Sequence, residues 1–284
     1  MISFLGIYRE PMCSPGRHRE NDATILELVA QGLESHGHGV ALASIENAER
    51  AGRDASVVFS MSRSPVGLQL LERWAREGKT IVNRPDAVID TARHRLARRS
   101  FGSVGLPATR IVATARPLRD RVGDAFSSTG QWVKGGDLYS SRREDVQRVE
   151  TRDALDRVLD DFERRGITTA ILQEHVEGRE IKFYAVGAAG FFHWLTSDDS
   201  PERSSQDGFQ QRATEAGTAL DLEIFGGDIV IRDDGRSVLI DLNDWPSFAP
   251  CREAGARAIA QHLEARFIEL YAVASPAGSA PPSV

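Results

Sequence analysis

The sequence is short of cysteine, of excess basic charge and of long apolar runs. Only two cysteines, Cys13 and Cys251, occur among its 284 residues, which argues against a disulfide framework. No Cys/His cluster has the spacing of zinc ligands. The formal net charge of −6 offers no basic field to nucleic acid, and no run is long enough to span a bilayer. We therefore expect a soluble protein of the reducing cytoplasm, without a nucleic-acid or membrane partner.

Familiar nucleotide-binding motifs and targeting signals are missing as well. The sequence contains no G-x-x-x-x-G-K-[ST], which excludes a P-loop, and no G-x-G-x-x-G after a strand. The N-terminal stretch MISFLGIYRE has no basic leader and no small-residue cleavage site, so it reads as a strand and not as a signal peptide. A chain of this length is expected to bury a substantial core in two or three lobes.

Strand and helix patterns alternate over the first hundred residues. Apolar runs predict strands at 2–8, 40–44, 55–60 and 79–83, with a helix capped by Asn21 or Asp22 and another over 65–77. This order is typical of an open, mostly parallel, doubly wound sheet, which binds ligands at the carboxyl ends of its strands. The loops after the first and third strands contain the candidate substrate contacts Arg9, Ser14, Arg17 and Arg63.

Strands dominate the rest of the chain. The patterns predict strands within 105–114, 130–136, 168–178, 180–187, 190–195, 226–231 and 237–243. They also predict helices at 93–100, 151–166, 209–220 and 253–271. The mixed charges of 141–148 read as a solvated face, 196–208 as a loop, and 273–284 as a disordered tail.

Three oxygen-bearing side chains converge in the C-terminal third. Alternation places Asp241 and Asn243 on one face of their strand, and a short hairpin brings Asp228 near them. Hard oxygen ligands on rigid strands suit Mg²⁺, which also takes phosphate oxygens from a nucleotide. For Asp241 and Asn243 alone, the alternative is an ordinary turn before Pro246.

Two further fragments are ambiguous when taken alone. Lys134 stands where a strand runs into glycines, so it either meets phosphates or is a solvated loop residue. Glu180 and Lys182 share one face of the strand that follows Gly178. They either serve the ribose and phosphates of a nucleotide or form a solvent-side ladder in an ordinary hairpin.

These fragments, in this order, resemble the ATP-grasp superfamily, in its glutathione synthetase-like and ribosomal-protein-modifying glutamate ligase-like branches. The resemblance covers about residues 83–270 and is carried by IVNRPDAVIDTARHRLARRSFGSVGLPATRIV, WVKGG, LQEHVEGREIKFYAVG and GGDIVIRDDGRSVLIDLNDWPSF. The last two segments are the ones most specific for this superfamily. The resemblance implies an α/β fold in which a doubly wound pre-ATP-grasp domain with a linker helix (1–105) precedes a two-lobed α+β ATP-grasp unit. Its central lobe would be 106–185 and its C-terminal lobe 186–272.

The resemblance implies a role for each matching position. Lys134 would bind the α and β phosphates of ATP, and Lys182, where relatives often have arginine, would bind a phosphate. Glu180 would bind ribose. The adenine would be held by the connection made of Gln173, Glu174, His175 and Val176.

The metal site and the linker depart from the family pattern in detail. One or two Mg²⁺ ions, or Mn²⁺, would be held by Asp228, Asp241 and Asn243. Asp241 stands where many relatives have glutamate, one methylene longer. The linker lysine of relatives is replaced within RHR, so that Arg93, His94 or Arg95 takes its place, with Arg93 assigned beside Lys182 to catalysis.

The implied activity is that of an ATP-dependent carboxylate–amine (or –thiol) ligase. It would act through an acyl phosphate on small-molecule acid and amine substrates, with release of ADP and phosphate. One alternative is an ATP-grasp small-molecule kinase that phosphorylates a hydroxyl, similar to the inositol phosphate kinases. Another is a nucleotide-binding protein without catalysis. The acid, the nucleophile and the oligomeric state, including a homo-oligomer, stay open.

Overall fold

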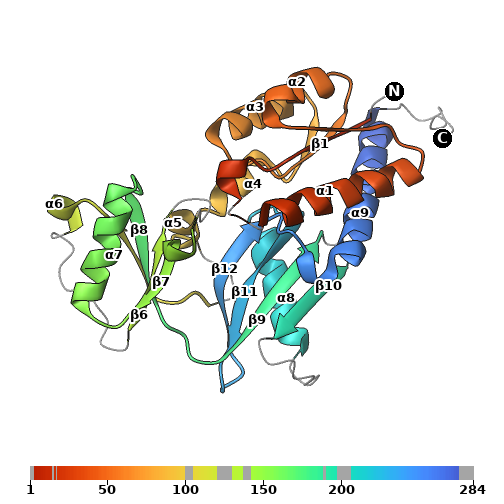
Figure 1. Ribbon diagram of the computed structural model, residues 1–284. Helices are drawn as coiled ribbons and strands as arrows, with labels where there is room; N and C mark the ends of the chain where they lie inside the picture. Colours follow the sequence, from red (N-terminus) through yellow and green to blue (C-terminus); the bar gives the residue numbers. More distant parts are fainter. Residues whose placement is uncertain are drawn as a thin grey trace.

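The computed structural model describes residues 3–14, 16, 18–99, 105–119, 130–136, 142–187, 190–196 and 206–274. Its strands form three four-stranded sheets, with the orders β2-β1-β3-β4, β5-β8-β6-β7 and β10-β9-β11-β12. Figure 1 shows the first sheet in red to orange, the second in yellow to green and the third in teal to blue. The mixed α/β class expected from the sequence is confirmed.

The first sheet is parallel throughout, as the alternating pattern predicts. It contains β1 (Phe4–Ile7), β2 (Val40–Ala43), β3 (Val57–Ser60) and β4 (Thr80–Val82), connected by α1 (His18–Ser35), α2 (Ala48–Ala51) and α3 (Pro65–Arg76). Helix α1 begins at His18, three residues before the expected cap. Asp22 is not free to cap it, because its buried carboxylate accepts a hydrogen bond from Ser14 and pairs with Arg9.

The second sheet is antiparallel and carries one long helix. It contains β5 (Thr109–Ala113), β6 (Gln131–Gly135), β7 (Val146–Val149) and β8 (Thr169–Glu174), and its helix is α7 (Arg152–Arg164). Thr151 caps α7 by accepting from the Ala154 amide. The second half of 141–148, expected as a solvated face, is part of β7, in which Val146 and Gln147 are half-buried and Arg148 is exposed.

The third sheet is antiparallel and has a helix on each face. It contains β9 (Arg179–Val186), β10 (Phe191–Thr196), β11 (Ile224–Ile231) and β12 (Ser237–Asp244). Helix α8 (Gln206–Thr218) packs on the face that carries Phe183 and Ala185. Helix α9 (Arg252–Ala274) packs against β9 on the opposite face, which carries Tyr184 and Val186.

Short helices fill the connections. These are α4 (Pro85–Asp90), α5 (Arg93–Leu96) and α6 (Arg116–Arg119), with the 3₁₀ turns η1 (Pro11–Cys13), η2 (Ile45–Asn47), η4 (Arg143–Asp145) and η5 (Ala249–Cys251). The predicted helix at 93–100 is thus shorter than expected. No helix of the described residues is long and apolar enough to cross a membrane. The predicted loop at 196–208 and tail at 273–284 lie mostly outside the described residues.

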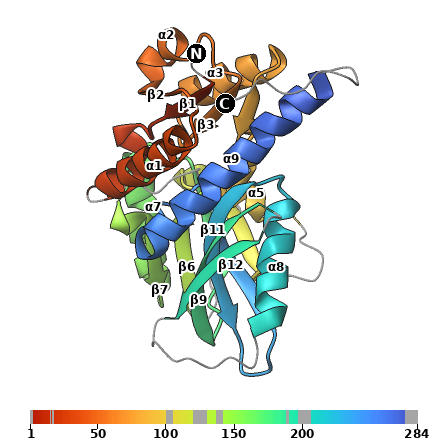
Figure 2. The same cartoon turned by 90° about the vertical axis from the view of Figure 1, so that its right-hand side faces the viewer.

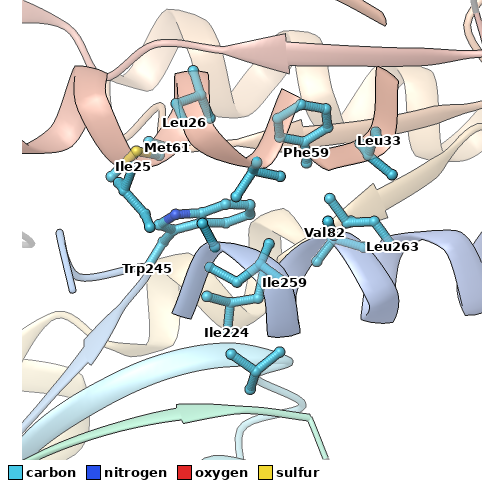
Figure 3. Packing of buried hydrophobic residues seen from close by; sticks show 14 of the residues in the cluster. Ile25, Leu26, Leu33, Phe59, Met61, Val82, Ile224, Trp245, Ile259 and Leu263 are labelled. Carbon is cyan, nitrogen blue, oxygen red and sulfur yellow. The ribbon is translucent and has the colours of Figure 1, made fainter. Parts of the chain in front are cut away.

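The first and third sheets share one hydrophobic core, whereas the second has its own. Helices α1 and α9 run side by side between the two sheets (Figures 1 and 2). In Figure 3, Trp245 lies at the centre of this core, among side chains of α1, β3, β11 and α9. Asn83, after β4, accepts from the Glu223 and Ile224 amides and donates to the Ile224 carbonyl. The second sheet packs only its own residues and α7 into a separate cluster.

Candidate nucleotide and metal site

A polar cavity of about 210 Å³ lies where the second sheet meets the third. It is lined by β6, β7, β8, the connection after β8, β9, β11 and β12. The lining residues are Trp132, Lys134, Val146, Gln173, Glu174, His175, Val176, Gly178, Glu180, Asp228, Val230, Ile240 and Asp241. The cavity therefore gathers most of the residues that the sequence assigned to a nucleotide site.

The floor of the cavity is a polar row across three strands of the third sheet. Lys182, Asp228 and Asp241 are direct register partners on β9, β11 and β12. The Lys182 ammonium lies 2.7 Å from an Asp228 carboxylate oxygen. Burial alone would lower the pKa of Lys182, but this ion pair outweighs it, and the pKa of the ammonium is raised. The pKa of Asp228 is raised, because burial and the nearby Asp241 and Glu180 carboxylates outweigh Lys182.

Arg93 reaches the other end of this row from α5. Its guanidinium lies 3.1 Å from an Asp241 carboxylate oxygen. Burial acts to raise the pKa of Asp241, but Arg93 and Lys134 outweigh burial and lower it. Of the three linker candidates, Arg93 alone makes a contact with the polar row, since His94 bonds to the Gly136 carbonyl and Arg95 pairs with Asp90. Asp241 is thus held as a carboxylate.

Lys134 enters the cavity from the second sheet. It is 6% exposed, and its ammonium donates to the Ile240 carbonyl over 3.1 Å. Ile240 has no partner on β11 because the register shifts after Asp228, and such a bulge takes a residue out of the strand ladder. Burial lowers the pKa of Lys134, although Asp241 acts in the opposite direction. The solvated-loop alternative for Lys134 was therefore wrong.

Asn243 lies two residues beyond Asp241 on β12, opposite Gly226. Alternation puts it on the same face as Asp241, so two carboxylates and one amide oxygen line this part of the sheet. Within the described ranges, no group of three His, Cys, Asp or Glu residues forms a metal site. The donor set nevertheless fits Mg²⁺, because this ion takes one or two carboxylates and completes its shell with water and phosphate oxygens.

The connection from β8 to β9 forms the opposite wall of the cavity. Gln173 is 7% exposed, while Glu174 is exposed at the cavity edge. The Trp132 indole N–H donates to His175 Nδ1 over 3.1 Å, which fixes the imidazole against β6. The chain turns at Gly178, which has a φ of +146°. A side chain has no room there, because an added Cβ would lie 2.3 Å from the Ile231 carbonyl oxygen.

Other candidates from the sequence lie elsewhere. Arg9 and Arg63, expected at a substrate, are buried; Arg9 pairs with Asp22 and Arg63 with Asp244. Arg17 lies outside the described residues. The sequence reasoning missed the lining residues Trp132, Val146, Val230 and Ile240. For Trp132 a signal was present, because it lies two positions before Lys134 on the same strand.

Comparisons with known proteins give no match in sequence but clear matches in structure. No family model matches the chain, and no curated protein matches it. The VanG D-Ala:D-Ser ligase from Enterococcus faecalis is similar with a TM-score of 0.70 and 12% identity, over 95% of this chain and 100% of that chain. The D-alanine–D-alanine ligase from Bacillus anthracis gives a TM-score of 0.69 and 12% identity, over 96% and 98%.

A third solved structure shows the same likeness. The RimK domain ATP-grasp protein from Sphaerobacter thermophilus gives a TM-score of 0.65 and 16% identity, over 92% of this chain and 100% of that chain. Each match spans nearly the whole of both chains, so the likeness extends over all three sheets and is not confined to one of them.

Proposed function

Because the chain has the ATP-grasp fold, we propose that it is an ATP-dependent ligase that joins a carboxylate to an amine or a thiol. The observation that carries this proposal is the gathering of Lys134, Lys182 and Arg93 around two carboxylates. Lys134 lines one cavity together with Asp228 and Asp241, and Lys182 and Arg93 each pair with one of these carboxylates. Three cations and two carboxylates at one junction match the needs of a triphosphate with its metal ion. Two of the similar structures are complexes, one with ATP and one with Mg and ADP.

The proposed reaction has two steps. A substrate carboxylate oxygen attacks the γ-phosphorus of ATP, the bond to the β–γ bridging oxygen breaks, and an acyl phosphate and ADP result. The amine or thiol then attacks the acyl carbon, loses its proton, and expels phosphate. The protein need not supply a covalent nucleophile, because fixed positive groups and exclusion of water provide the stabilisation.

Each residue of the cavity has a binding task in this scheme. The backbone of Glu174 to Val176 holds adenine, and Glu180 binds the ribose hydroxyls. Lys134 and Lys182 exchange their present partners for phosphate oxygens. Asp228, Asp241 and Asn243 would hold Mg²⁺, which neutralises phosphate charge. We place this activity in a reducing cytoplasm, consistent with a chain that has only two cysteines, Cys13 and Cys251.

The kinase alternative has less support from the geometry. A kinase for highly phosphorylated substrates calls for a strongly basic cleft. Two of the arginines that would supply it are engaged elsewhere, because Arg63 pairs with Asp244 and Arg84 with Asp86. Product analysis separates the two activities, since a ligase releases free phosphate and a kinase leaves it on the acceptor.

The proposal is tested by measuring ADP and phosphate release against a panel of amino acids, small peptides and sugar phosphates with Mg²⁺. Asp241→Ala and Asn243→Ala are each expected to lower turnover on the order of 100-fold or more while the fold survives. Asp234→Ala is the matched control, since Asp234 is exposed at the turn of the same hairpin. Wild-type turnover in the Asp241 or Asn243 variant would refute the metal assignment, and the absence of any Mg²⁺-dependent nucleotide binding would refute the function.

A further inference from the structure

Strand β9 sets the order in which the candidate adenine, ribose and phosphate positions follow one another. The adenine connection precedes it, and alternation puts Glu180, Lys182 and Tyr184 in this order on one face of the strand, with Glu180 lining the cavity. Alternate residues on one face of a strand are about 6.6 Å apart. A nucleotide with its ribose at Glu180 and phosphates at Lys182 therefore has its γ-phosphate end toward Tyr184.

Tyr184 stands at the boundary between the polar row and the apolar core. Its ring is 7% exposed and packs against Phe248, with 5.4 Å between ring centroids, and against His193, with 6.3 Å. Tyr184 belongs to the core shared with α9, whereas Lys182, two residues before it, faces the cavity row. The ring is thus anchored by packing, which fixes where its hydroxyl can lie.

The side chain of Tyr184 leaves β9 on the same face as Lys182, two residues before it. Its pKa is raised by burial; the Lys182 ammonium acts to lower it, and Cys251 and Asp228 act to raise it. Lys182 and Asp228, both in the polar row, are thus among the groups whose charge acts on the phenol. A phenol with a raised pKa keeps its proton at neutral pH and can donate a hydrogen bond to an anion.

The position beside Tyr184 on β11 carries no side chain. In its register row, Tyr184 is followed by Gly226 and Asn243. Gly226 has no side chain, and a Cβ there would lie 2.9 Å from Pro246 Cγ. Pro246 therefore covers the position of Gly226 on β11, which lies between Asn243 on β12 and Tyr184 on β9.

We propose that the Tyr184 hydroxyl donates a hydrogen bond to the transferred phosphoryl group, first as the γ-phosphate of ATP and then as the phosphate of the acyl phosphate. This role rests on the proposed function, because it requires a nucleotide along β9. Tyr184 keeps its proton throughout and acts as a fixed donor. It would bind the γ-phosphate in addition to the cations that bind the phosphates nearer the ribose.

The test needs nucleotides only, so the unknown substrates do not enter. Binding of Mg·ADP and of Mg·AMPPCP, which carries a methylene between the β and γ phosphorus atoms, is measured by calorimetry. Tyr184→Phe is expected to weaken Mg·AMPPCP on the order of 10-fold or more, as for loss of a hydrogen bond to a charged group, and to leave Mg·ADP unchanged. Tyr8→Phe is the matched control, because the Tyr8 hydroxyl donates to the exposed Glu27 carboxylate of α1, away from the cavity.

Each outcome bears on a different claim. Equal affinities of wild type and Tyr184→Phe for Mg·AMPPCP, or an equal loss for both nucleotides, would overturn the role of Tyr184 alone. A wild-type protein that binds neither nucleotide would overturn the proposed function and this role with it. A melting temperature close to that of wild type shows that Tyr184→Phe keeps the ring packing, so that a selective loss reports the hydroxyl.

Discussion

Lys134 and Ile240 lie on different sheets, and the Lys134 ammonium donates to the Ile240 carbonyl over 3.1 Å. The acceptor belongs to the one residue that the register shift leaves without a partner on β11. A bulge therefore supplies a carbonyl to a cation that arrives from the opposite wall of the cavity. This contact places a positive charge beside Asp241 before any nucleotide binds.

Lys134→Met is expected to weaken Mg·ADP binding while raising the free energy of unfolding at neutral pH. Burial lowers the pKa of Lys134, so the charged form is disfavoured in the folded state. The resulting penalty is complete below the folded-state pKa and disappears as pH rises toward the ordinary value of 10.5. Urea unfolding of both proteins from pH 7 to 10.5 measures this difference, which should shrink as pH rises.

Lys79→Met provides the control for Lys134. The Lys79 ammonium donates to the carbonyls of Gly52, Arg53 and Ala55, away from the cavity. Its loss should leave Mg·ADP binding at the wild-type level. A Lys134→Met protein with unchanged nucleotide affinity would contradict the phosphate role of Lys134.

Free Mg²⁺ or Mn²⁺ is expected to bind weakly without nucleotide. Asp228 is paired with Lys182 and Asp241 with Arg93, so a metal ion alone must displace a cation from each carboxylate. A triphosphate gives those cations new partners, and metal and nucleotide should therefore bind together. The electron paramagnetic resonance signal of free Mn²⁺ should fall only when ADP is added.

Lys182→Gln sharpens this test. It removes the cation that occupies Asp228, so Mn²⁺ should bind more tightly to this variant than to wild type when ADP is absent. If the wild-type protein binds Mn²⁺ tightly when ADP is absent, the ion pairs do not compete with the metal.

Gly226→Ala is expected to destabilise the protein. The added Cβ would lie 2.6 Å from the Phe183 carbonyl oxygen and 2.9 Å from Pro246 Cγ, so the backbone must shift. Overpacking of this kind costs about 1–3 kcal/mol. Gly208→Ala in α8 is the opposite case, since nothing lies within 4 Å of the new Cβ, and it should stabilise by about 0.5–1 kcal/mol. Thermal unfolding of both variants gives the comparison, and equal melting temperatures would contradict the close approach of Pro246.

Arg63→Met is expected to lower the free energy of unfolding by about 3–5 kcal/mol, since it leaves the buried Asp244 carboxylate without its ion-pair partner. Arg63 lies 2.5 Å from an Asp244 carboxylate oxygen and also donates to the Asp244 carbonyl. Urea denaturation measures the loss. Arg73→Met, which breaks an exposed pair with Glu49, should cost less than about 1 kcal/mol. Similar losses in the two variants would refute a structural role for Arg63.

The strands of the third sheet and the polar row across them could be predicted from the sequence. Alternation fixes the face of Asp241 and Asn243, and the short hairpin fixes their distance from Asp228. Only three lysines occur in the chain, and two of them, Lys134 and Lys182, are at the cavity. The scarcity of lysine, with two of the three at one site, is therefore a signal in the composition that is independent of the motifs.

The ion-pair partners of the arginines at the strand ends could not be predicted from the sequence. Arg9 and Arg63 follow parallel strands, where ligands commonly bind. Their partners, however, are Asp22, Asp244 and the Trp245 carbonyl, and two of these are more than 180 residues away in sequence. No local pattern encodes which of two distant segments approaches a strand end. For the same reason, the sequence does not indicate that the Lys134 ammonium donates to the Ile240 carbonyl.

The core around Trp245 joins the beginning of the chain to its end. Phe4 and Ile25 pack in the same cluster as Ile259 and Leu263, whereas the second sheet closes over residues 112–172 alone. During synthesis on the ribosome, the first sheet must therefore wait for α9 before its apolar face is covered. The second sheet contains only contacts of shorter sequence range, so it can fold while the rest of the chain is still being made. Deleting α9 should yield an aggregating product whose middle third remains resistant to protease.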